Sequence, residues 1–385
     1  MNEALRTDEG IVREAFAIAA RAKAEMAKRI VGKEAVIRGI LTGVLASGHV
    51  LLEGVPGLAK TLAVKTFAEI SGLEFSRIQF TPDLLPADIT GSLVYEQATG
   101  KFQARRGPLF ANVVLADEVN RAPAKVQSAL LEAMEEGQVT IGDASHKLPE
   151  PFFVLATQNP IEHEGTYALP EAQLDRFLMK VYLGYPSAEE ETAIVAKQVE
   201  RVRAPLSTVL GPMEIKLMRL AAEAVTLDEA IAAYIVRIVR ATRPKASAPA
   251  VTGGNGANSS ALAGLQPRTA ALSSFASTLS TAAGLSAGGR FGVASAAKAS
   301  ISDSNSHDIE RWVEFGASPR ASIHLYRCAR IFALLDGRDY ALPDDVKAAA
   351  PEVLRHRLVL SYQAEADGID ADAIVANVLR AVVVP

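Results

Sequence analysis

The chain has 385 residues, of which 49% are hydrophobic and 22% are charged, and its formal net charge at pH 7 is −4. This length and composition indicate an ordinary folded protein of two or three domains, and global disorder is not expected. The slightly acidic balance gives the whole chain no electrostatic footprint for nucleic acid, so no nucleic-acid partner is expected. No apolar run could span a bilayer and the first residues lack the apolar core of a signal peptide. We therefore expect a cytoplasmic protein with no direct membrane insertion.

Cysteine and histidine usage argues against disulfides and metal centres built on these residues. Cys328 is the single cysteine of the sequence, and its helical, apolar surroundings predict a buried structural residue. The six histidines are scattered, and none is paired with a cysteine or a second histidine at metal-ligand spacing. The sequence therefore predicts no zinc or haem site.

The first half of the chain alternates helical and strand patterns. A helical pattern runs from Ile11 to Ile30, and a second one follows Val31-Gly32. Short apolar runs then alternate with helical patterns such as Ala124 to Glu136. These runs are His49 to Leu52, Phe75 to Phe80, Val113 to Ala116, Phe152 to Ala156 and Phe177 to Tyr182. The alternation predicts an α/β fold with a mainly parallel sheet and helices on both faces.

The pattern changes near Tyr185, after which helical signals dominate to the end of the chain. We therefore predict an α/β domain over residues 1–185 and an all-α domain over residues 186–385. Within the second domain, residues 246–302 are mainly Ala, Gly, Ser and Thr, with no acidic residue. Such a segment buries little apolar surface, so we expect a flexible insertion at about 246–306, with a short partner-recognition element as the alternative.

A glycine-rich loop follows the first predicted strand and opens a helical pattern. Its sequence is Gly54-Val55-Pro56-Gly57-Leu58-Ala59-Lys60-Thr61. Backbone N–H groups of such a loop, with the positive end of the next helix, surround phosphate oxygens. Lys60 is expected to reach the β- and γ-phosphates of ATP, and the Thr61 hydroxyl to bind Mg²⁺. Ala59 replaces the usual glycine, which a right-handed conformation tolerates; a chance glycine turn is the alternative.

Two acids, Asp117 and Glu118, end the apolar run that begins at Val113. Burying unpaired carboxylates is costly, so adjacent acids at a buried strand end point to a specific role. Asp117 is predicted to bind Mg²⁺ and Glu118 to polarise the attacking water. A solvated strand end is the alternative, but the phosphate loop upstream favours a nucleotide site.

Three further motifs complete the pattern. They are Ala156-Thr157-Gln158-Asn159-Pro160, the segment from Leu169 to Phe177, and Gly316-Ala317-Ser318-Pro319-Arg320. With the phosphate loop and the segment from Leu115 to Gln127, they make the chain resemble AAA+ ATPases of the MoxR group in the helix-two-insert clade. The resemblance implies a P-loop core at 1–185 and a helical lid at 186–385. Lids of this group usually lack a long insertion, so the segment at about 246–306 departs from the pattern.

The resemblance also implies roles for single residues. Asn159 resembles the sensor-1 residue that orients water, and Arg176 resembles the arginine finger that enters a neighbouring subunit's site. Arg320 resembles sensor 2, reaching the γ-phosphate of its own subunit, and Val31-Gly32 resembles the backbone that receives adenine. The alternatives are a turn-capping Asn159, a salt bridge from Arg176 to Asp175 or Glu171, and a solvated Arg320. Ser318 and Pro319 suit the first positions of the helix that carries Arg320.

Two hairpins are expected in the first domain. The prolines between Thr81 and Gly91 and the Thr-Gly turn before Lys101 interrupt any continuous helix there. This matches the hairpin that interrupts the second helix in the clade. A second hairpin is predicted from Gln138 to Leu148. By resemblance, we expect both to face the pore of a ring and to contact a client.

The function implied by resemblance is Mg-dependent ATP hydrolysis by a homo-oligomeric ring, a hexamer, that remodels or activates a partner protein in the manner of a chaperone. A partner with a von Willebrand A domain is implied in the same way. The alternatives are the motor subunit of a metal chelatase and an ATP-binding scaffold with little turnover. The segment Ala122 to Gln127 favours the MoxR group over the chelatase motors, and Glu118 and Arg176 argue against the scaffold.

Overall fold

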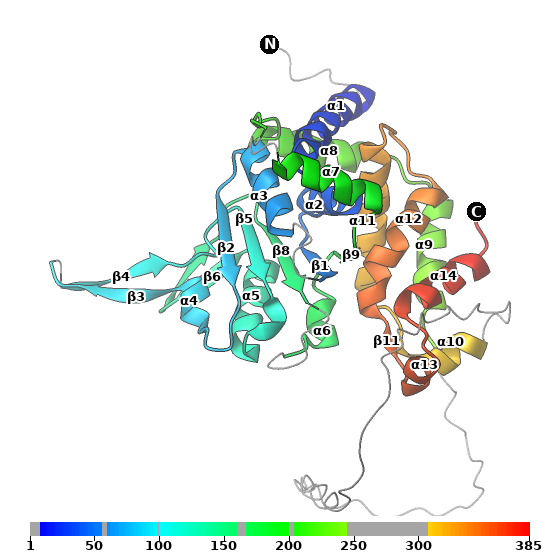
Figure 1. Cartoon of the computed structure of the whole chain (residues 1–385). Helices are drawn as coiled ribbons and strands as arrows, with labels where there is room; N and C mark the ends of the chain where they lie inside the picture. Colours follow the sequence, from blue (N-terminus) through cyan, green and yellow to red (C-terminus); the bar gives the residue numbers. More distant parts are fainter. Residues whose placement is uncertain (1–7, 56–59, 99, 160–166, 200–203, 245–306) are drawn as a thin grey trace, which may run out of the picture. The chain divides into compact units, whose positions relative to one another are not determined.

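The computed structural model describes residues 8–55, 60–98, 100–159, 167–199, 204–244 and 307–385 (Figure 1). The loop residues Pro56, Gly57, Leu58 and Ala59 and the predicted insertion at 246–306 lie outside these ranges. None of the helices in the described part of the chain is both long enough and apolar enough to span a bilayer.

The described residues of the first half form one five-stranded parallel sheet, in the order β2-β5-β8-β1-β9. The strands are β1 (Val50–Gly54), β2 (Phe75–Gln79), β5 (Val113–Asp117), β8 (Phe153–Gln158) and β9 (Met179–Leu183). They correspond to the five apolar runs of the sequence, so the predicted α/β class with a parallel sheet is confirmed. Parallel strands place all their carboxyl ends at one edge, where α/β folds bind ligands next to a change of strand order.

Helices cover both faces of this sheet because successive side chains of a strand point to opposite faces. Val50, Leu52 and Leu115 point into a core shared with the helices on one face, namely α1 (Asp8–Ala27), α2 (Glu34–Leu45) and α3 (Lys60–Ser71). Leu51 and Val114 point into a second core on the other face, which holds α5 (Ala124–Glu136) and α4 (Pro86–Thr90). The sheet is therefore buried on both sides, as its continuous apolar strands predict.

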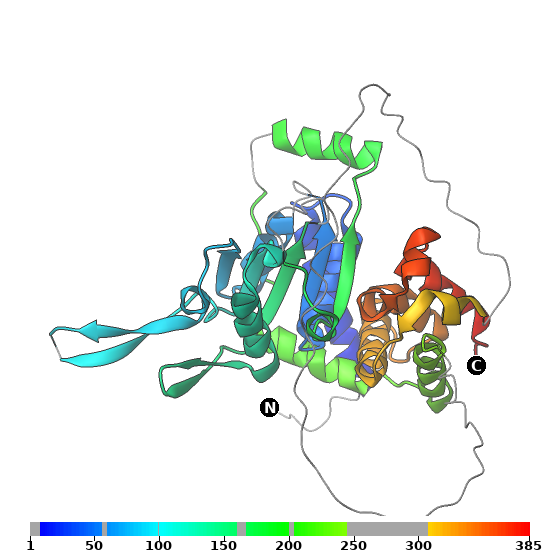
Figure 2. The ribbon, with the colours of Figure 1, turned by 90° about the horizontal axis from the view of Figure 1, so that it is seen from below.

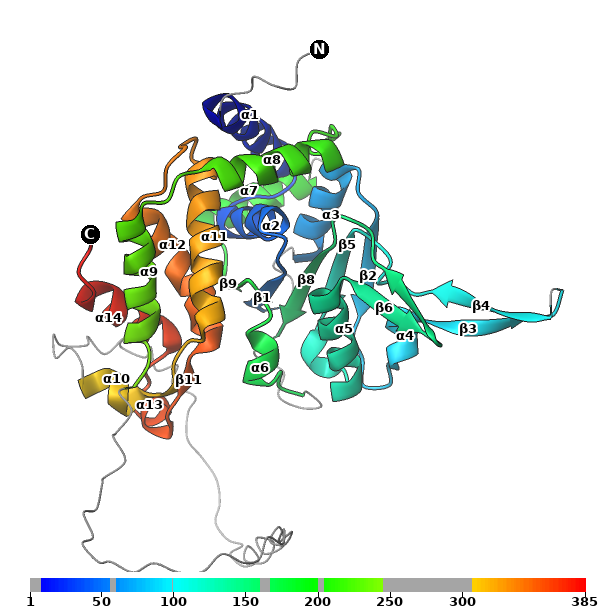
Figure 3. The same ribbon diagram turned by 180° about the vertical axis from the view of Figure 1, so that it is seen from behind.

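Two antiparallel hairpins project from the same side of the sheet domain (Figures 2 and 3). The first pairs β3 (Gly91–Glu96) with β4 (Lys101–Arg106), and the second pairs β6 (Gln138–Ile141) with β7 (Ala144–Lys147). At the base of the first hairpin, Gly91 has φ 101°, and a Cβ there would overlap the carbonyl oxygen of Arg105. Glycine is therefore required where the two strands separate.

Helices dominate after β9, as the sequence predicts. They are α7 (Ala188–Val199), α8 (Pro212–Ala224), α9 (Glu229–Ala241), α10 (His307–Trp312), α11 (Pro319–Leu335), α12 (Pro343–Leu354), α13 (Tyr362–Ala366) and α14 (Ala371–Ala381). A short ladder of β10 (Val313–Phe315) with β11 (Val359–Leu360) lies among them. The short helices η1 (Val119–Arg121), α6 (Glu171–Leu174) and η2 (Arg355–Arg357) complete the described elements.

The helices that follow β9 do not pack only with one another. Arg219 of α8 donates two hydrogen bonds to the carbonyl oxygen of Val44 in α2, at 3.0 and 2.7 Å. Arg38 of α2 lies 3.3 Å from the carboxylate of Glu352 in α12 and over the ring of Phe332 in α11. The boundary at residue 185 remains a prediction, because packing is continuous across it.

Candidate functional site

The two ends of the phosphate loop lie at the carboxyl edge of the sheet. Gly54 ends β1, and Lys60 and Thr61 open α3. The Lys60 ammonium donates to the carbonyl oxygens of Gly54 and, at 3.3 Å, of Gln158 at the end of β8. Burial lowers the pKa of Lys60, while the nearby carboxylates of Asp117, Glu118 and Glu53 act in the opposite direction. Lys60 is thus a half-buried cation with acids close by.

Gly54 is required by the close approach of β9. A Cβ at Gly54 would lie 2.6 Å from Cβ of Leu183 and 2.8 Å from its carbonyl oxygen. Real Cβ atoms do not come that close to backbone atoms, so a side chain here would push the two strands apart. The glycine therefore serves strand packing at the start of the loop as well as the turn; Val55 follows it, half-buried.

Thr157 of β8 makes hydrogen bonds to both Asp117 and Glu118. Its hydroxyl donates to Oδ1 of Asp117 at 2.6 Å and accepts from the backbone N–H of Glu118 at 2.9 Å. Arg77 of β2 approaches the other oxygen of Asp117, with Nη2 2.7 Å from Oδ2. The Asp117 carboxylate is therefore fixed on both sides, by a hydroxyl and by a guanidinium.

Glu118 has a left-handed backbone, with φ 57° and ψ 49°. Strained conformations of non-glycine residues cluster at functional sites. Its Oε2 accepts from Nε2 of Gln79 at 2.9 Å and from Nη1 of Arg121 at 3.1 Å. The side chain that is predicted to polarise water is thus hydrogen-bonded within its own subunit.

Asn159 and the predicted adenine element lie at the same carboxyl edge. Asn159 follows β8 directly and is 5% exposed. Gly32 has φ 63° and lies against the carboxylate of Glu190 in α7. The neighbouring Lys33 donates to the carbonyl oxygen of Gly184, just after β9, at 3.1 Å. The structure therefore brings Lys60, Thr61, Asp117, Glu118, Asn159 and Val31-Gly32 to the carboxyl ends of the strands.

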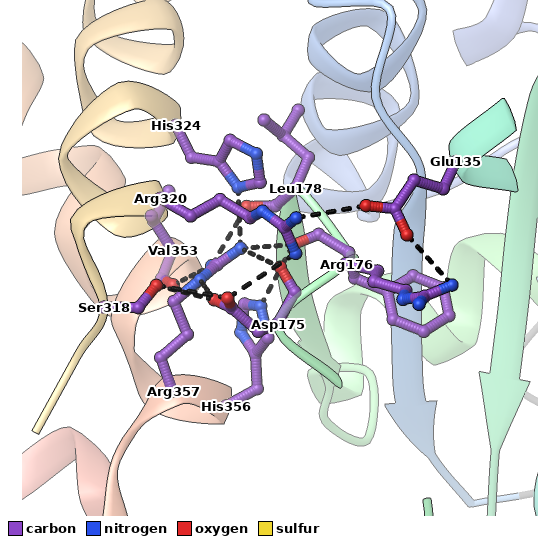
Figure 4. Close-up of polar contacts among 11 residues, drawn as sticks. Glu135, Asp175, Arg176, Leu178, Ser318, Arg320, His324, Val353, His356 and Arg357 are labelled. Carbon is purple, nitrogen blue, oxygen red and sulfur yellow. Dashed lines mark hydrogen bonds and ion pairs between the residues drawn. The ribbon is translucent and has the colours of Figure 1, made fainter. Parts of the chain in front are cut away.

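Arg176 and Arg320 form a separate cluster around α5 and α6 (Figure 4). Nη1 of Arg176 lies 3.0 Å from Oε2 of Glu135 and 3.1 Å from the carbonyl oxygen of Leu131. Nη2 of Arg320 lies 3.2 Å from the other oxygen of Glu135, and its Nη1 lies 3.6 Å from Oδ2 of Asp175. Arg176 does form a salt bridge, but its partner is Glu135 rather than the sequence neighbours Asp175 or Glu171.

This cluster lies at the amino edge of the sheet, opposite the phosphate loop. His49, which precedes β1, bonds through Nε2 to the carbonyl oxygen of Met134 at 3.0 Å, beside Glu135. The backbone N–H of Leu178, just before β9, donates to the carbonyl oxygen of His49 at 2.8 Å. Five-residue strands separate the two edges by about 13 Å.

In this structure Arg320 therefore lies with Glu135 and Asp175, away from the phosphate loop of its own subunit, and its predicted role at the γ-phosphate stays a prediction. Arg320 begins α11, as predicted, and Ser318 occupies the N-cap position. The Ser318 hydroxyl, however, donates to the Asp175 carboxylate at 3.1 Å instead of capping the helix. That contact holds the start of α11 at the amino edge, with Arg176.

Comparison with known proteins identifies the family of the chain. The family model described as "ATPase family associated with various cellular activities (AAA)" matches residues 49–179, and an AAA lid domain model matches residues 306–378. The chain is 44% identical over 378 residues to chaperone MoxR1 of Mycobacterium tuberculosis, covering 98% of this chain and 85% of that protein. The chain belongs to the MoxR family of AAA+ ATPases.

Other relatives match over similar lengths. The uncharacterized protein YeaC of Bacillus subtilis is 40% identical over 359 residues, covering 92% of this chain and 91% of that protein. MoxR of Methylorubrum extorquens is 29% identical over 377 residues, covering 94% and 93%. A crystal structure of a protein described as an ATPase from Cytophaga hutchinsonii has a TM-score of 0.76 and 38% identity, covering 97% of each chain.

Several residues of this MoxR-family site were not identified from the sequence. Arg77 and Gln79 are separated by two positions in β2, so they share a face, and parallel pairing with β5 places that face beside the acids. The period-two alternation of side chains along a strand could have identified these two residues from the sequence. Thr157, Glu135 and Arg357 gave no such signal, because their partners come from distant parts of the chain.

Proposed function

We propose that this chain binds Mg-ATP at the carboxyl ends of β1, β5 and β8 and hydrolyses it within a homo-oligomeric ring. The separation of the two groups of residues across the sheet supports this most directly. Arg176 and Arg320 lie at the amino edge, and Lys60, Glu118 and Asn159 lie at the carboxyl edge. One subunit therefore holds the phosphate site at one edge of the sheet and Arg176 and Arg320 at the opposite edge. A closed ring of identical heterologous contacts, such as a hexamer, joins each pair to the next site.

In the proposed mechanism, Lys60 and the phosphate loop hold the β- and γ-phosphates. Thr61 and Asp117 provide oxygen ligands for Mg²⁺, which supplies positive charge against the phosphate oxygens. Glu118 polarises the attacking water, and Asn159 orients it. The neighbour's Arg176 and Arg320 neutralise charge that develops on the transferred phosphoryl group, an effect of up to ~10³–10⁵ in rate for an arginine finger.

The residues at the carboxyl edge suit magnesium and nucleotide. Mg²⁺ in nucleotide sites takes one or two protein oxygens, waters and substrate phosphates, so it needs no protein cage. The described residues contain no cluster of three or more His, Cys, Asp and Glu side chains able to hold an ion. Arg77 now contacts Oδ2 of Asp117, and Gln79 and Arg121 contact Glu118. We infer that nucleotide binding moves these partners and releases both acids.

The mechanical output proposed is remodelling or activation of a partner protein, as for a chaperone. The M. tuberculosis relative is named a chaperone. The β3–β4 hairpin supports a client contact. It projects from the fold, and four of its apolar side chains are exposed. These are Leu93 (46%), Val94 (45%), Tyr95 (54%) and Phe102 (68%). Exposed apolar patches of this kind mark protein interaction sites. A partner with a von Willebrand A domain is part of the proposal by resemblance.

The proposal is tested by measuring steady-state ATP hydrolysis against protein concentration, with ATP binding measured separately. Wild type, Glu118→Gln and Arg176→Ala are compared. Specific activity should rise with concentration, and both variants should lose hydrolysis while Glu118→Gln still binds ATP. Binding without turnover at any concentration would favour the scaffold, and no ATP binding would refute the proposed site.

A further inference from the structure

Arg357 is a buried cation whose guanidinium binds the turn that carries Arg176. It lies in η2, and the residue is 6% exposed. Its Nε donates to Oδ1 of Asp175 at 2.8 Å, and its Nη2 donates to the carbonyl oxygens of Asp175, at 3.1 Å, and Phe177. Its Nη1 donates to the carbonyl oxygen of Leu178 at 3.3 Å. One side chain therefore bonds the backbone on both sides of Arg176 (Figure 4).

The same guanidinium is linked to α11, which carries Arg320. Its Nη2 lies 2.6 Å from Nδ1 of His324. Burial and the neighbouring arginines lower the pKa of His324 to about 3, so its neutral ring can accept this hydrogen bond. The Asp175 carboxylate that Arg357 binds also accepts from Ser318 and lies 3.6 Å from Arg320. Arg357 and Asp175 thus join α6, α11 and η2 at one point.

This arrangement requires the guanidinium itself. Arginine presents five N–H donors in a rigid plane, whereas lysine presents three from one nitrogen and cannot reach a carboxylate and three carbonyls together. A buried ion pair is weak evidence for stability, since apolar residues of similar volume often serve as well. Fixing the geometry of two arginines explains the buried charge better.

We propose that Arg357 is a positioning residue that presents Arg176 and Arg320 together to the neighbouring subunit. It does so by fixing the turn at residues 175–178 and, through Asp175, the start of α11. The inference rests on the proposed ring. Loss of the Arg357 guanidinium and its hydrogen bonds would let both arginines shift. The phosphate site, at the opposite edge of the sheet, would stay intact.

The first test compares Arg357→Lys with Arg355→Lys. Arg355 is in the same short helix but binds Asp372 at 2.9 Å and the carbonyl oxygen of Lys180 at 3.2 Å, away from the turn. We expect Arg357→Lys to lower kcat by about 10- to 100-fold, as small misplacements of catalytic groups do. KM for ATP should change by less than about two-fold, because the phosphate site is not altered. Arg355→Lys should keep the wild-type kcat, and equal losses in the two variants would overturn the proposal.

The second test separates positioning from general damage by mixing subunits. Glu118→Gln subunits lack hydrolysis but carry intact Arg176, Arg320 and Arg357. When they are mixed with Arg357→Lys subunits, each Arg357→Lys site that meets an intact arginine face should recover. At equal amounts this gives about a quarter of wild-type activity in a randomly mixed ring. No recovery would overturn the proposal.

The control mixture is Arg176→Ala with Glu118→Gln. If it recovers activity and the Arg357→Lys mixture does not, the inference about Arg357 fails while the ring stands. If neither recovers, the proposed function itself fails.

Thermal unfolding and ATP binding establish that Arg357→Lys is folded. If it is not, Ser318→Ala removes the hydroxyl donor of Asp175 without leaving a buried charge. It should then give a smaller loss of kcat that mixing restores, and an unchanged kcat would overturn the proposal.

Discussion

Arg176 and Arg320 share one carboxylate: the two oxygens of Glu135 lie 3.0 Å from Nη1 of Arg176 and 3.2 Å from Nη2 of Arg320. The first arginine follows α6 in the sheet domain, and the second begins the helix α11 far along the chain. A common counter-ion keeps the pair together at the amino edge of the sheet. In the proposed ring, that edge would serve the adjacent subunit's site.

Replacing Glu135 tests whether this carboxylate competes with the neighbour's nucleotide. Glu135 is exposed, so Glu135→Gln should change the free energy of unfolding by no more than ~1 kcal/mol. The same change releases both arginines, so half-maximal specific activity should occur at up to about five-fold lower protein concentration. Glu136→Gln, at the adjacent exposed position, is the matched control. A shift to higher concentration would mean that Glu135 orients the arginines instead.

Thr157 should be needed for both stability and hydrolysis. Thr157→Val removes the hydroxyl that serves Asp117 and the N–H of Glu118, leaving partly buried polar groups without that partner. We expect a loss of about 1–3 kcal/mol in the free energy of unfolding, measured with urea, and a lower kcat. Thr157→Ser keeps the hydroxyl and should retain most of both. Equal behaviour of the two variants would contradict the assigned role.

Gly54 offers a test of strand packing at the phosphate loop. Gly54→Ala places a methyl group against the backbone of Leu183, at 2.6–2.8 Å from its Cβ and carbonyl oxygen. Relief of this overlap must separate β1 from β9, at a cost of about 1–3 kcal/mol, and should weaken ATP binding. Gly184→Ala is the control, because a Cβ there meets nothing within 4 Å. Wild-type ATP affinity and stability in Gly54→Ala would contradict the packing argument.

His49 should make stability depend on pH. Burial lowers its pKa to about 4, from a usual value near 6.5. Between these values the unfolded chain binds a proton that the folded chain does not, so stability falls as pH decreases from about 6.5 to 4. The contribution of His49 is at most about 1.4 kcal/mol per pH unit. Urea unfolding at pH 7 and pH 5 should show a smaller difference in His49→Gln than in wild type. An unchanged difference would assign the pH dependence to other groups, such as His324, whose pKa is also lowered.

Local patterns predicted the sheet and the residues at its carboxyl edge. The short apolar runs correspond to β1, β2, β5, β8 and β9. The order of these parallel strands places Lys60, Asp117 and Asn159 at the same edge of the sheet. These features depend on neighbours in sequence and on the common direction of the strands.

The amino edge could not be predicted in this way. The position of Arg320 depends on how α11 docks, and that docking is fixed by contacts from Ser318 and Arg357 to Asp175. No periodic pattern in the sequence predicts any of these contacts. Ser318 illustrates the limit, because its N-cap position was correct while its side chain served a residue from the sheet domain.

The central claim is that each ATP site is completed by the arginines of another subunit. Mixing Glu118→Gln subunits with Arg176→Ala or with Arg320→Ala subunits tests it most directly, with ATP hydrolysis as the measurement. Each variant alone should be inactive or nearly so, and each equal mixture should recover about a quarter of wild-type activity in a randomly mixed ring. No recovery in either mixture would contradict the account. If only the Arg176→Ala mixture recovered, Arg320 would act at the site of its own subunit.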